Sequence, residues 1–330
     1  MNTIRARVRT ALLPALCFAL CAAFCGVVLC GCAASSPQEE EGGMEHAENS
    51  EAGLRRTVLY YQSDDGFVVP MMKLIPWEEG IGKAALACLV DTADNRVSAA
   101  EMGLNPIIPE GTAFSLRIAD DKVATLDLQG LTASPDGETE RAMVQAIVNT
   151  LAEFPTIDAV TITLNGKEVR ELPNGTALKA AMTPFALNAE DGEITASTEG
   201  ASALTLYFAN KTGSLNVPVT RYVQSGGGTT FEAAMAALLE GPRDDALLQC
   251  FPEGTALLSA DLYDGVARVN LSAEFLSSQY VEGLAEAAYE TMYLTANAMQ
   301  EIYQLDVLVE GEPCVLTESC TAPVYANTFR

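Results

Sequence analysis

The pentapeptide Pro-Glu-Gly-Thr-Ala occurs twice in this chain, at residues 109–113 and again at residues 252–256. Each occurrence runs into a segment that predicts two strands around a tight turn, at residues 114–128 and 257–271. The chain therefore contains a tandem repeat, and each copy is expected to fold as a comparable unit. The repeat also allows an internal comparison, because chemistry that both copies perform should appear in both.

The likeness extends upstream of the pentapeptides. An Ala/Leu-rich stretch at residues 83–91 corresponds to residues 232–240, and both stretches predict a helix of about three turns. Before these helices, residues 58–70 and 205–218 both have the pattern of a strand, a polar turn and a second strand. The two copies therefore share a longer order of elements than the pentapeptide alone indicates.

Helix and turn signals are clearest in the second copy. Thr229 and Glu232 have the spacing of a capping box, and Gly241-Pro242 predicts the end of the same helix. Asp264-Gly265 suits a two-residue hairpin turn because glycine tolerates positive φ. Alternation after this turn places Ala267, Val269 and Leu271 on one face, matched in the first copy by Ala124, Leu126 and Leu128.

A second helix and a final strand follow in each copy. The helical spacing is carried by Met143, Ile147, Leu151 and Phe154 and by Ala285, Tyr289, Met292, Ala296 and Met299. The strand pattern is carried by Val160, Ile162 and Leu164 and by Leu305, Val307 and Val309. We expect two tandem α+β domains at residues 55–190 and 203–330, joined by a linker at 191–202, each with a small mixed sheet packed by two helices.

The N-terminal residues have the pattern of a secretion signal. Three arginines precede an uncharged apolar stretch at residues 11–30, and Leu29-Cys30-Gly31-Cys32 is followed by small polar residues. The tetrad resembles a bacterial lipobox, so we expect residues 1–31 to be a lipoprotein signal peptide and Cys32 to receive the lipid. An uncleaved membrane anchor is the alternative, since about 20 apolar residues can cross a bilayer. Both predict a chain on the extracytoplasmic face of the cell membrane.

Acidic residues outnumber basic ones in the rest of the chain. Residues 32–54 contain six glutamates and no basic side chain, which predicts a flexible linker. The whole chain has 19 basic and 44 acidic residues, with a formal net charge of −25. Nucleic acid is not an expected partner, because phosphate binding requires clustered Lys and Arg. We expect contact with the membrane through the N-terminal lipid, and envelope proteins, some of them basic, as partners.

The single histidine, His46, lies in the acidic linker. A flexible linker cannot hold an imidazole beside a nucleophile or a metal, which argues against Ser-His-Asp triads, Cys-His dyads and histidine zinc sites. A pair of carboxylates is a remaining route to catalysis, but Asp120-Asp121 and Asp244-Asp245 fall in predicted turns and loops. We therefore expect no catalytic residues, no cofactor and no metal site.

Three other features are candidate sites. The repeated turn residues are expected to serve backbone geometry rather than chemistry. They are Pro109, Glu110, Gly111 and Thr112 and, in the second copy, Pro252, Glu253, Gly254 and Thr255. Cys314 and Cys320 are close enough in sequence for a disulfide, which an oxidising exterior permits. Trp77, with Tyr60 and Tyr61, could form a platform for stacking sugars, although such aromatic residues more often pack in a core.

Four stretches together resemble the GerMN, or germane, domain family. They are the hairpin segments at residues 123–128 and 266–271, residues 146–166, and the Ala-Leu-Leu-Glu-Gly-Pro sequence at residues 237–242. The first copy departs from the family pattern at residues 87–95. The second copy has Tyr293-Leu294-Thr295-Ala296 in place of the usual Val-Asn-Thr-Leu.

The resemblance implies domains that look like the ring-building modules of secretion systems. It also implies a lipoprotein that helps to assemble an envelope-spanning complex between mother cell and forespore, and the family has no catalytic residue set to carry over. Our hypothesis is a non-enzymatic, lipid-anchored envelope protein whose two domains bind proteins of a sporulation or germination complex. The alternatives are a peptidoglycan- or glycan-binding module, suggested by Trp77, and a carboxylate-dependent glycosidase.

Overall fold

The computed structural model describes residues 53–77, 80–224, 228–316 and 320–329, all within one compact unit, Glu48–Arg330. The predicted signal peptide, the lipidation site Cys32 and the acidic linker up to residue 52 lie outside the described residues. Among the helices of the described part, none is long and apolar enough to cross a membrane.

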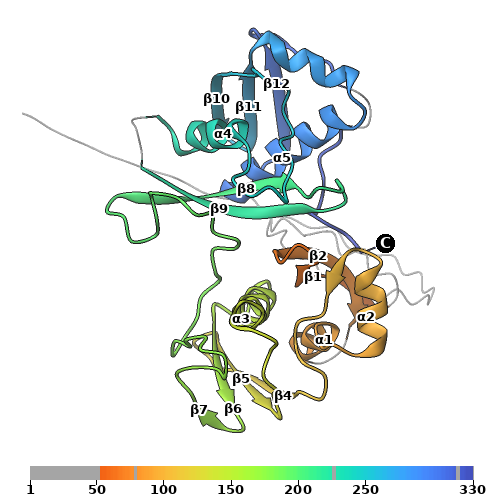
Figure 1. Cartoon of the computed structure of the whole chain (residues 1–330), viewed down its shortest axis with the longest axis vertical. Helices are drawn as coiled ribbons and strands as arrows, with labels where there is room; N and C mark the ends of the chain where they lie inside the picture. Colours follow the sequence, from red (N-terminus) through yellow and green to blue (C-terminus); the bar gives the residue numbers. More distant parts are fainter. Residues whose placement is uncertain (1–52, 78–79, 225–227, 317–319, 330) are drawn as a thin grey trace, which may run out of the picture. The chain divides into compact units, whose positions relative to one another are not determined.

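The first copy follows the predicted order of strands and helices, with short elements added (Figure 1). Its elements are β1 (Leu54–Ser63), β2 (Val68–Pro76), α1 (Ile81–Cys88), α2 (Ala93–Ala100), β3 (Leu104–Asn105), β4 (Ala113–Ile118), β5 (Val123–Gln129), α3 (Gly137–Ala152), β6 (Ala159–Leu164) and β7 (Lys167–Glu168).

The second copy repeats this order without counterparts of α2 and β3 and with one 3-10 helix added. Its elements are β8 (Ala201–Ala209), β9 (Asn216–Gln224), α4 (Thr230–Glu240), β10 (Leu257–Tyr263), β11 (Val266–Leu271), the 3-10 helix η1 (Ala273–Tyr280), α5 (Leu284–Met299), β12 (Gln304–Val309) and β13 (Glu312–Pro313). Its first strand begins at Ala201, slightly before residue 203, where the second domain was expected to start.

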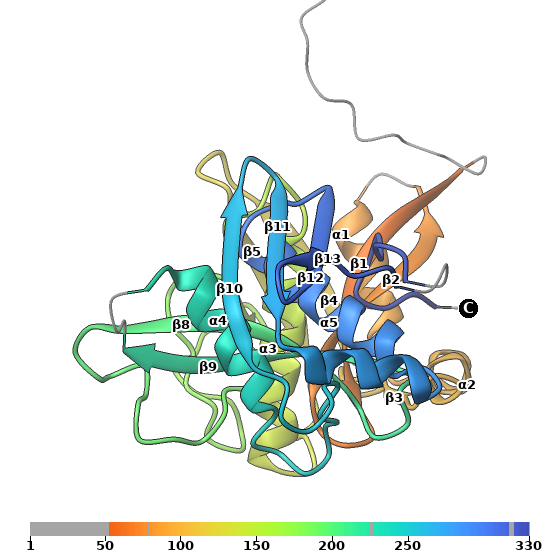
Figure 2. The same ribbon diagram turned by 90° about the horizontal axis from the view of Figure 1, so that it is seen from above.

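Each copy has a long antiparallel hairpin, two principal helices and a four-stranded mixed sheet (Figures 1 and 2). The helices α1 and α3 contact both the β1–β2 hairpin and the β4-β5-β6-β7 sheet, and α4 likewise contacts both β8 and β10. In each sheet the central pair is parallel, β5 with β6 and β11 with β12, and the outer pairs are antiparallel. The predicted α+β fold with a mixed sheet and two helices in each copy is confirmed. The hairpin strands, however, lie in separate sheets, β2-β1-β3 in the first copy and β8-β9 in the second.

Two-residue turns with left-handed backbone close three hairpins of the mixed sheets, β6–β7, β10–β11 and β12–β13. Asp264 and Gly265 have φ values of 50° and 75°, as their sequence predicted. The same conformation at Asn165-Gly166 and Glu310-Gly311 reverses the chain after β6 and β12. These turns lead into the short strands β7 and β13. Each of these strands has only two residues, too few for an alternation of apolar residues to indicate it.

The apolar faces predicted from the repeat form the core. Ala124, Leu126 and Leu128 of β5 and Ala267, Val269 and Leu271 of β11 are all fully buried. So are Met143, Ile147 and Leu151 of α3 and Met292 and Ala296 of α5. Both copies bury the same face of equivalent elements. The core is therefore duplicated along with the sequence.

The end signals of α4 act as predicted. The Thr229 hydroxyl accepts a hydrogen bond from the backbone N–H of Glu232 at 3.0 Å, and Gly241 follows the helix with a φ of 87°. In the first copy, where the sequence departs from the family pattern, the chain instead enters the extra helix α2. Thr92 caps that helix by accepting a hydrogen bond from the N–H of Asn95 at 3.2 Å.

Candidate functional site at the junction of the two copies

The repeated pentapeptides lie in turns outside the core. In each copy the threonine N–H donates to the proline carbonyl, at 3.2 Å in the first copy and 3.1 Å in the second, and the glycine has a φ of 82° or 85°. A positive φ at the third residue is what a type II turn requires of glycine. Glu110 and Glu253 are exposed beside these turns. The geometry accounts for the repeated residues without assigning them a chemical role.

The aromatic residues singled out in the sequence do not form one platform. Tyr61 is buried in the core, where its hydroxyl donates to the Cys88 carbonyl at 3.2 Å. Trp77 is 58% exposed and lies near the far end of the β1–β2 hairpin from Tyr60, with the Arg55 guanidinium 5.1 Å from its ring centroid. Trp77 is therefore accessible on its own, with a cation over its ring.

The structure carries Cys314 and Cys320 as thiols rather than as a disulfide. Burial raises the pKa of the Cys314 thiol, the amide of Gln279 lowers it, and the nearby Cys320 raises it further. Cys320 is thus near enough to act on the Cys314 thiol, and oxidation of the two to a disulfide stays a prediction.

The paired aspartates serve turns and loops. The Asp121 carboxylate accepts the N–H of Val123 at 3.1 Å, and the Asp244 carboxylate accepts the N–H of Ala246 at 2.8 Å. These side chains are exposed, whereas a carboxyl group that acts as an acid catalyst is usually desolvated. In the described part of the chain, no group of three or more His, Cys, Asp or Glu side chains is placed to hold a metal ion.

Several polar side chains make multiple hydrogen bonds where the two copies meet. Asn188, which follows the first copy, accepts a hydrogen bond from the N–H of Val68 at 2.9 Å. Its amide donates to the carbonyls of Val68 and Pro218, at 2.8 and 2.7 Å. A single side chain therefore joins β2 of the first copy to β9 of the second.

Asn327, which follows the second copy, makes an equivalent set of hydrogen bonds with the roles of the two copies exchanged. It accepts the N–H of Asn216 at 2.8 Å and donates to the carbonyls of Asn216 and Pro70, at 2.8 and 2.9 Å. Pro70 and Pro218 occupy the same place in the repeat, as the alignment of residues 58–70 with 205–218 indicates. The two asparagines therefore clamp β2 and β9 in a quasi-twofold arrangement.

Backbone pairing extends each clamp. We call residues 187–190 and 326–329 the trailing segments, because each follows one copy of the repeat. Ala189 forms a parallel bridge with Thr220 of β9, and Thr328 forms one with Met72 of β2. Each copy thus sends its trailing segment onto the hairpin of the other copy, and this reciprocal exchange links the two domains.

Side chains beyond the bridges differ between the two ends. Arg221 of β9 is buried and donates to both carboxylate oxygens of Glu190, at 2.5 and 3.0 Å, and to the carbonyls of Ala237 and Gly241, both at 2.7 Å. A trailing-segment carboxylate and the C-terminal end of α4 therefore share one guanidinium, a geometry that satisfies a buried charge well.

At the corresponding place in the first copy, an aromatic ring replaces the carboxylate. The Phe329 ring lies 4.6 Å from the Lys73 ammonium and packs against Tyr61 with ring centroids 5.2 Å apart. The junction therefore uses an ion pair at one end and a cation–π contact at the other.

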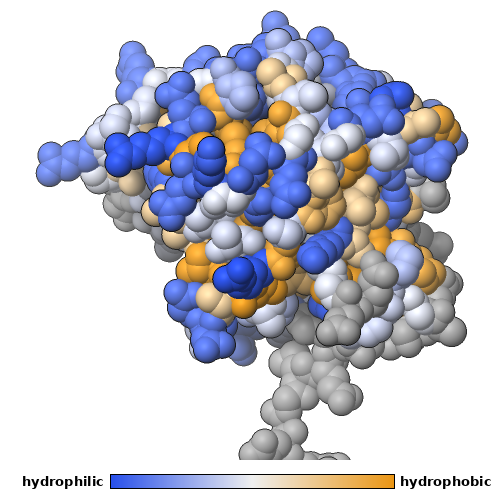
Figure 3. Space-filling model, turned by 90° about the horizontal axis from the view of Figure 1, so that it is seen from below, coloured by the Kyte–Doolittle hydropathy of each residue, from blue (hydrophilic) through white to orange (hydrophobic). Residues whose placement is uncertain are grey.

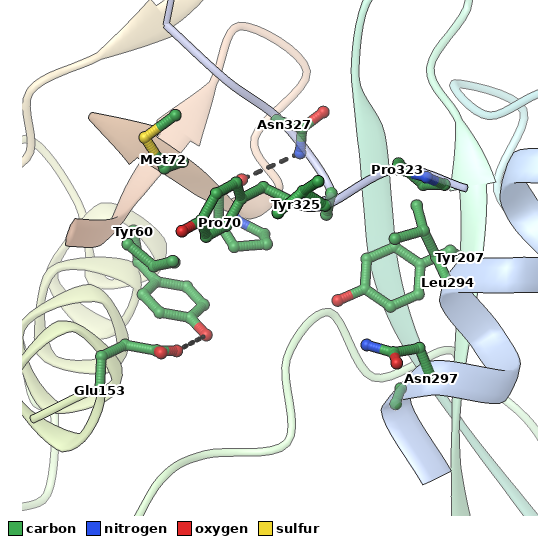
Figure 4. Close-up of a pocket in the computed structure, with 14 residues that line it drawn as sticks. Tyr60, Pro70, Met72, Glu153, Tyr207, Leu294, Asn297, Pro323, Tyr325 and Asn327 are labelled. Atoms are coloured by element: carbon green, nitrogen blue, oxygen red, sulfur yellow. Dashed lines mark hydrogen bonds between the residues drawn. The ribbon is translucent and has the colours of Figure 1, made fainter. Parts of the chain in front are cut away.

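A cleft of about 180 Å³ lies beside the clamps (Figure 4). Tyr60 and Glu153 line it from the first copy, and Tyr207 and Asn297 line it from the second, while residues 323–327 form another wall. Figure 4 shows the Tyr60 hydroxyl directed at Glu153 and the Tyr207 hydroxyl directed into the space between the copies. A second cleft, of about 160 Å³, also has Tyr60 and Tyr207 in its lining.

The polar groups of the first cleft are electrostatically coupled. Burial raises the pKa of the Glu153 carboxyl, and the hydrogen bond from the Tyr60 hydroxyl, 2.8 Å long, opposes this shift. Burial and the Glu153 charge together raise the pKa of Tyr207 to about 12 and that of Tyr60 well above its usual value. Both tyrosines therefore keep their protons at neutral pH.

Sequence reasoning missed Glu153, Asn188 and Asn327. Glu153 lies within one of the segments that carry the family resemblance, and its place at the end of a helix gave no sign of a cleft. Asn188 and Asn327 lie in segments without periodicity. The signal that could have found them is an asparagine at a similar distance after each copy of the repeat.

Comparisons with known proteins agree with this architecture. The family model described as "Germane: Sporulation and spore germination" matches residues 58–170 and 205–315. The chain is 26% identical over 317 residues to the spore germination protein GerM of Bacillus subtilis (strain 168), covering 90% of this chain and 84% of that protein. The solved structure of the tandem GerMN domains of the sporulation protein GerM from Bacillus subtilis matches with a TM-score of 0.70 and 24% identity, covering 84% of this chain and 100% of that one.

Proposed function

Because the chain belongs to the germane family, we propose that it is a non-enzymatic envelope protein that binds other proteins of a sporulation or germination complex through its two linked GerMN domains. The observation that carries this proposal is the reciprocal exchange of trailing segments. The polar side chains at this junction, Asn188, Asn327 and Arg221, form hydrogen bonds that join the two copies. Such a junction holds two domain surfaces in a fixed relation, which suits a scaffold for partners.

The surface supports a role in binding proteins. On the face in Figure 3, hydrophobic patches lie among hydrophilic residues. Interfaces of non-obligate complexes are about as apolar as this kind of mixed surface. The formal net charge of −25 would favour partners with basic segments by steering their approach.

We propose that lipid on Cys32 anchors the protein to the extracytoplasmic face of the membrane. The lipobox-like sequence supports this, and Cys30 in the same tetrad provides a matched control. Metabolic labelling with a radioactive fatty acid should label the wild type and the Cys30→Ala variant, whereas Cys32→Ala should be unlabelled and released from the membrane. Equal labelling of all three chains would contradict the proposed anchor.

Cross-linking in intact cells tests the binding function. A tagged full-length chain is cross-linked, purified under denaturing conditions, and its partners are identified by mass spectrometry. We expect a membrane protein with a basic extracytoplasmic segment. Recovery of wall fragments alone would contradict the proposal. So would turnover of a cell-wall substrate that one carboxylate substitution abolishes.

A glycan-binding module is the second candidate, and the exposure of Trp77 favours it. Exposed aromatic rings are common contact points because they present a large apolar face. Sedimentation with purified cell wall separates the two functions. A glycan-binding module should lose sedimentation in the Trp77→Ala variant, whereas the proposed protein-binding function predicts that wild type and variant sediment equally little.

A further inference from the structure

The cleft of Tyr60, Glu153 and Tyr207 has the composition of a site for a positive group. Glu153 forms no ion pair with any Lys or Arg of the described part, so its negative charge is available to a ligand. Tyr60 supplies one hydrogen bond to the carboxylate, at 2.8 Å. A carboxylate has further acceptor positions that a cationic donor can occupy.

The tyrosines add to the attraction for a cation. Aromatic faces attract ammonium and guanidinium groups within about 6 Å of the ring, more strongly where water is excluded. Tyr60, Tyr207 and Tyr325 all line the cleft, which brings rings from both copies and from the C-terminal residues to one place (Figure 4). Asn297 lies in the same lining, with its amide oxygen bonded to the backbone N–H of Ile302 at 3.0 Å.

The second cleft provides an internal contrast. Its lining shares Tyr60 and Tyr207 with the first cleft but contains no charged side chain. Thr150 of α3 and Thr295 of α5 occupy equivalent positions, so Ala298 is the counterpart of Glu153 in the second copy, and both of these residues line the first cleft. Of these two clefts, only the first has a carboxylate in its lining, and the second copy has an alanine where the first copy has that carboxylate.

The size of the first cleft limits its ligand. Sites for small molecules usually enclose about 300–1,000 Å³. A space of about 180 Å³ is smaller and suits a single side chain. A positive side chain also agrees with the acidic character of the whole protein, which repels anions.

We propose that this cleft receives a lysine or arginine side chain of a partner protein, with Glu153 as the counter-ion and Tyr60 and Tyr207 as walls. The proposal deepens the proposed function and rests on it for the nature of the partner. It assigns the recognition of that partner to the junction, where both copies contribute to one site.

Calorimetry tests the site by measuring how tightly short peptides bind to the full-length chain in detergent micelles. The probes are acetyl-Gly-Gly-Lys-Gly-Gly-amide, its arginine analogue, and the analogue with uncharged norleucine. The variant is Glu153→Gln, which keeps an acceptor for the Tyr60 hydroxyl. The control is Glu138→Gln, because the Glu138 side chain is 88% exposed on the first turn of the same helix. Circular dichroism checks that both variants fold.

We expect the lysine or the arginine peptide to bind the wild type at least about tenfold more tightly than the norleucine peptide, as a charge-assisted hydrogen bond predicts. Glu153→Gln should remove this preference, and Glu138→Gln should retain it. The proposal is overturned if neither charged peptide binds, if norleucine binds equally well, or if both variants weaken binding equally, which would indicate only the general negative charge.

The cell experiment separates this site from the proposed function. If the wild type and the Glu153→Gln variant capture an envelope protein equally, the proposed role of the cleft is wrong and the proposed binding function stands. If the peptide preference depends on Glu153 but the wild type captures no protein, the site stands and the proposed function is wrong.

Discussion

The Thr150 hydroxyl on α3 accepts a hydrogen bond from the backbone N–H of Tyr60 on β1 at 2.9 Å. The second copy repeats this bond, since Thr295 on α5 accepts the N–H of Tyr207 at 3.0 Å. Both threonines are fully buried. The threonine is kept although the residue before it changes from Asn149 to Leu294, and in both copies it fixes the strand that presents a cleft tyrosine.

Replacing Thr150 by Val should destabilise the protein, because the Tyr60 N–H would lose its acceptor inside the core. We expect a loss of about 1–3 kcal/mol in the free energy of unfolding. Thr150→Ser keeps the hydroxyl and should cost less, and Thr125→Val on the exposed face of β5 should have little effect. Urea denaturation measures all three variants. Equal stability of Thr150→Val and the wild type would show that the bond is unimportant.

Glu190→Ala should be among the most destabilising changes at the junction. It leaves the Arg221 guanidinium, which is 1% exposed, without its main counter-ion, and breaking a buried pair costs roughly 3–5 kcal/mol. The matched control is Asp306→Ala, which breaks the pair with Arg268 near the surface and should cost about 0–1 kcal/mol. Denaturant unfolding compares the two. Similar costs would mean that Arg221 finds other acceptors.

Alkaline pH should weaken the folded state through Tyr207. Its pKa is raised to about 12 in the folded protein, against about 10 in an unfolded chain, so the folded state holds this proton more tightly. The resulting stabilisation is present below about pH 10 and is lost as the pH rises through about 12. Between about pH 10 and about pH 12, the free energy of unfolding should fall less steeply with rising pH in the Tyr207→Phe variant than in the wild type.

Glu153 provides a second check on that pH dependence. Because the Glu153 charge helps to raise the pKa of Tyr207, the Glu153→Gln variant should ionise Tyr207 at lower pH. Tyrosinate absorbance, compared between Glu153→Gln and the Glu153→Gln/Tyr207→Phe double variant, isolates this residue. An unchanged midpoint would mean that burial alone sets the pKa.

The asparagine clamps should control local opening of the junction. Asn327→Asp and Asn188→Asp keep the acceptor oxygen but lose both donated hydrogen bonds and place a negative charge beside carbonyl groups. Hydrogen exchange at the N–H groups of Met72 and Thr220, which bond the trailing segments, should become at least about tenfold faster, as a loss of about 1.4 kcal/mol or more predicts.

A turn asparagine serves as the control for the clamps. Asn165 accepts the N–H of Gly130 at 3.2 Å through an oxygen that aspartate retains. Asn165→Asp should therefore leave the exchange of Met72 and Thr220 unchanged. If it accelerates exchange as much as the clamp variants do, the effect reflects added charge rather than the clamps.

The sequence predicted what depends on local pattern. Alternation identified the buried face of β11, and the capping signal at Thr229 and the Asp264-Gly265 turn were correct because each acts within a few residues. Helix α2 was missed because the Asp-Thr-Ala-Asp segment lacks apolar periodicity, and its start depends on the Thr92 cap.

The junction could not be predicted in this way. Asn188 and Asn327 matter because of partners in the other copy, and Asn327 contacts Pro70, which lies 257 positions away in the sequence. No periodic pattern records such a contact. Glu153 likewise lies in a segment that the family resemblance included, but its role in the cleft depends on Tyr207 from the second copy.

We propose above all that the two linked copies, held in one arrangement, form the surface that partners bind. The most direct test is cross-linking capture in cells by the wild type and by the Asn188→Asp/Asn327→Asp double variant, at equal amounts of membrane-bound protein. We predict that the double variant captures at least about tenfold less partner, because opening the junction separates the two halves of the surface. Equal capture by a variant whose junction exchanges faster would contradict the claim.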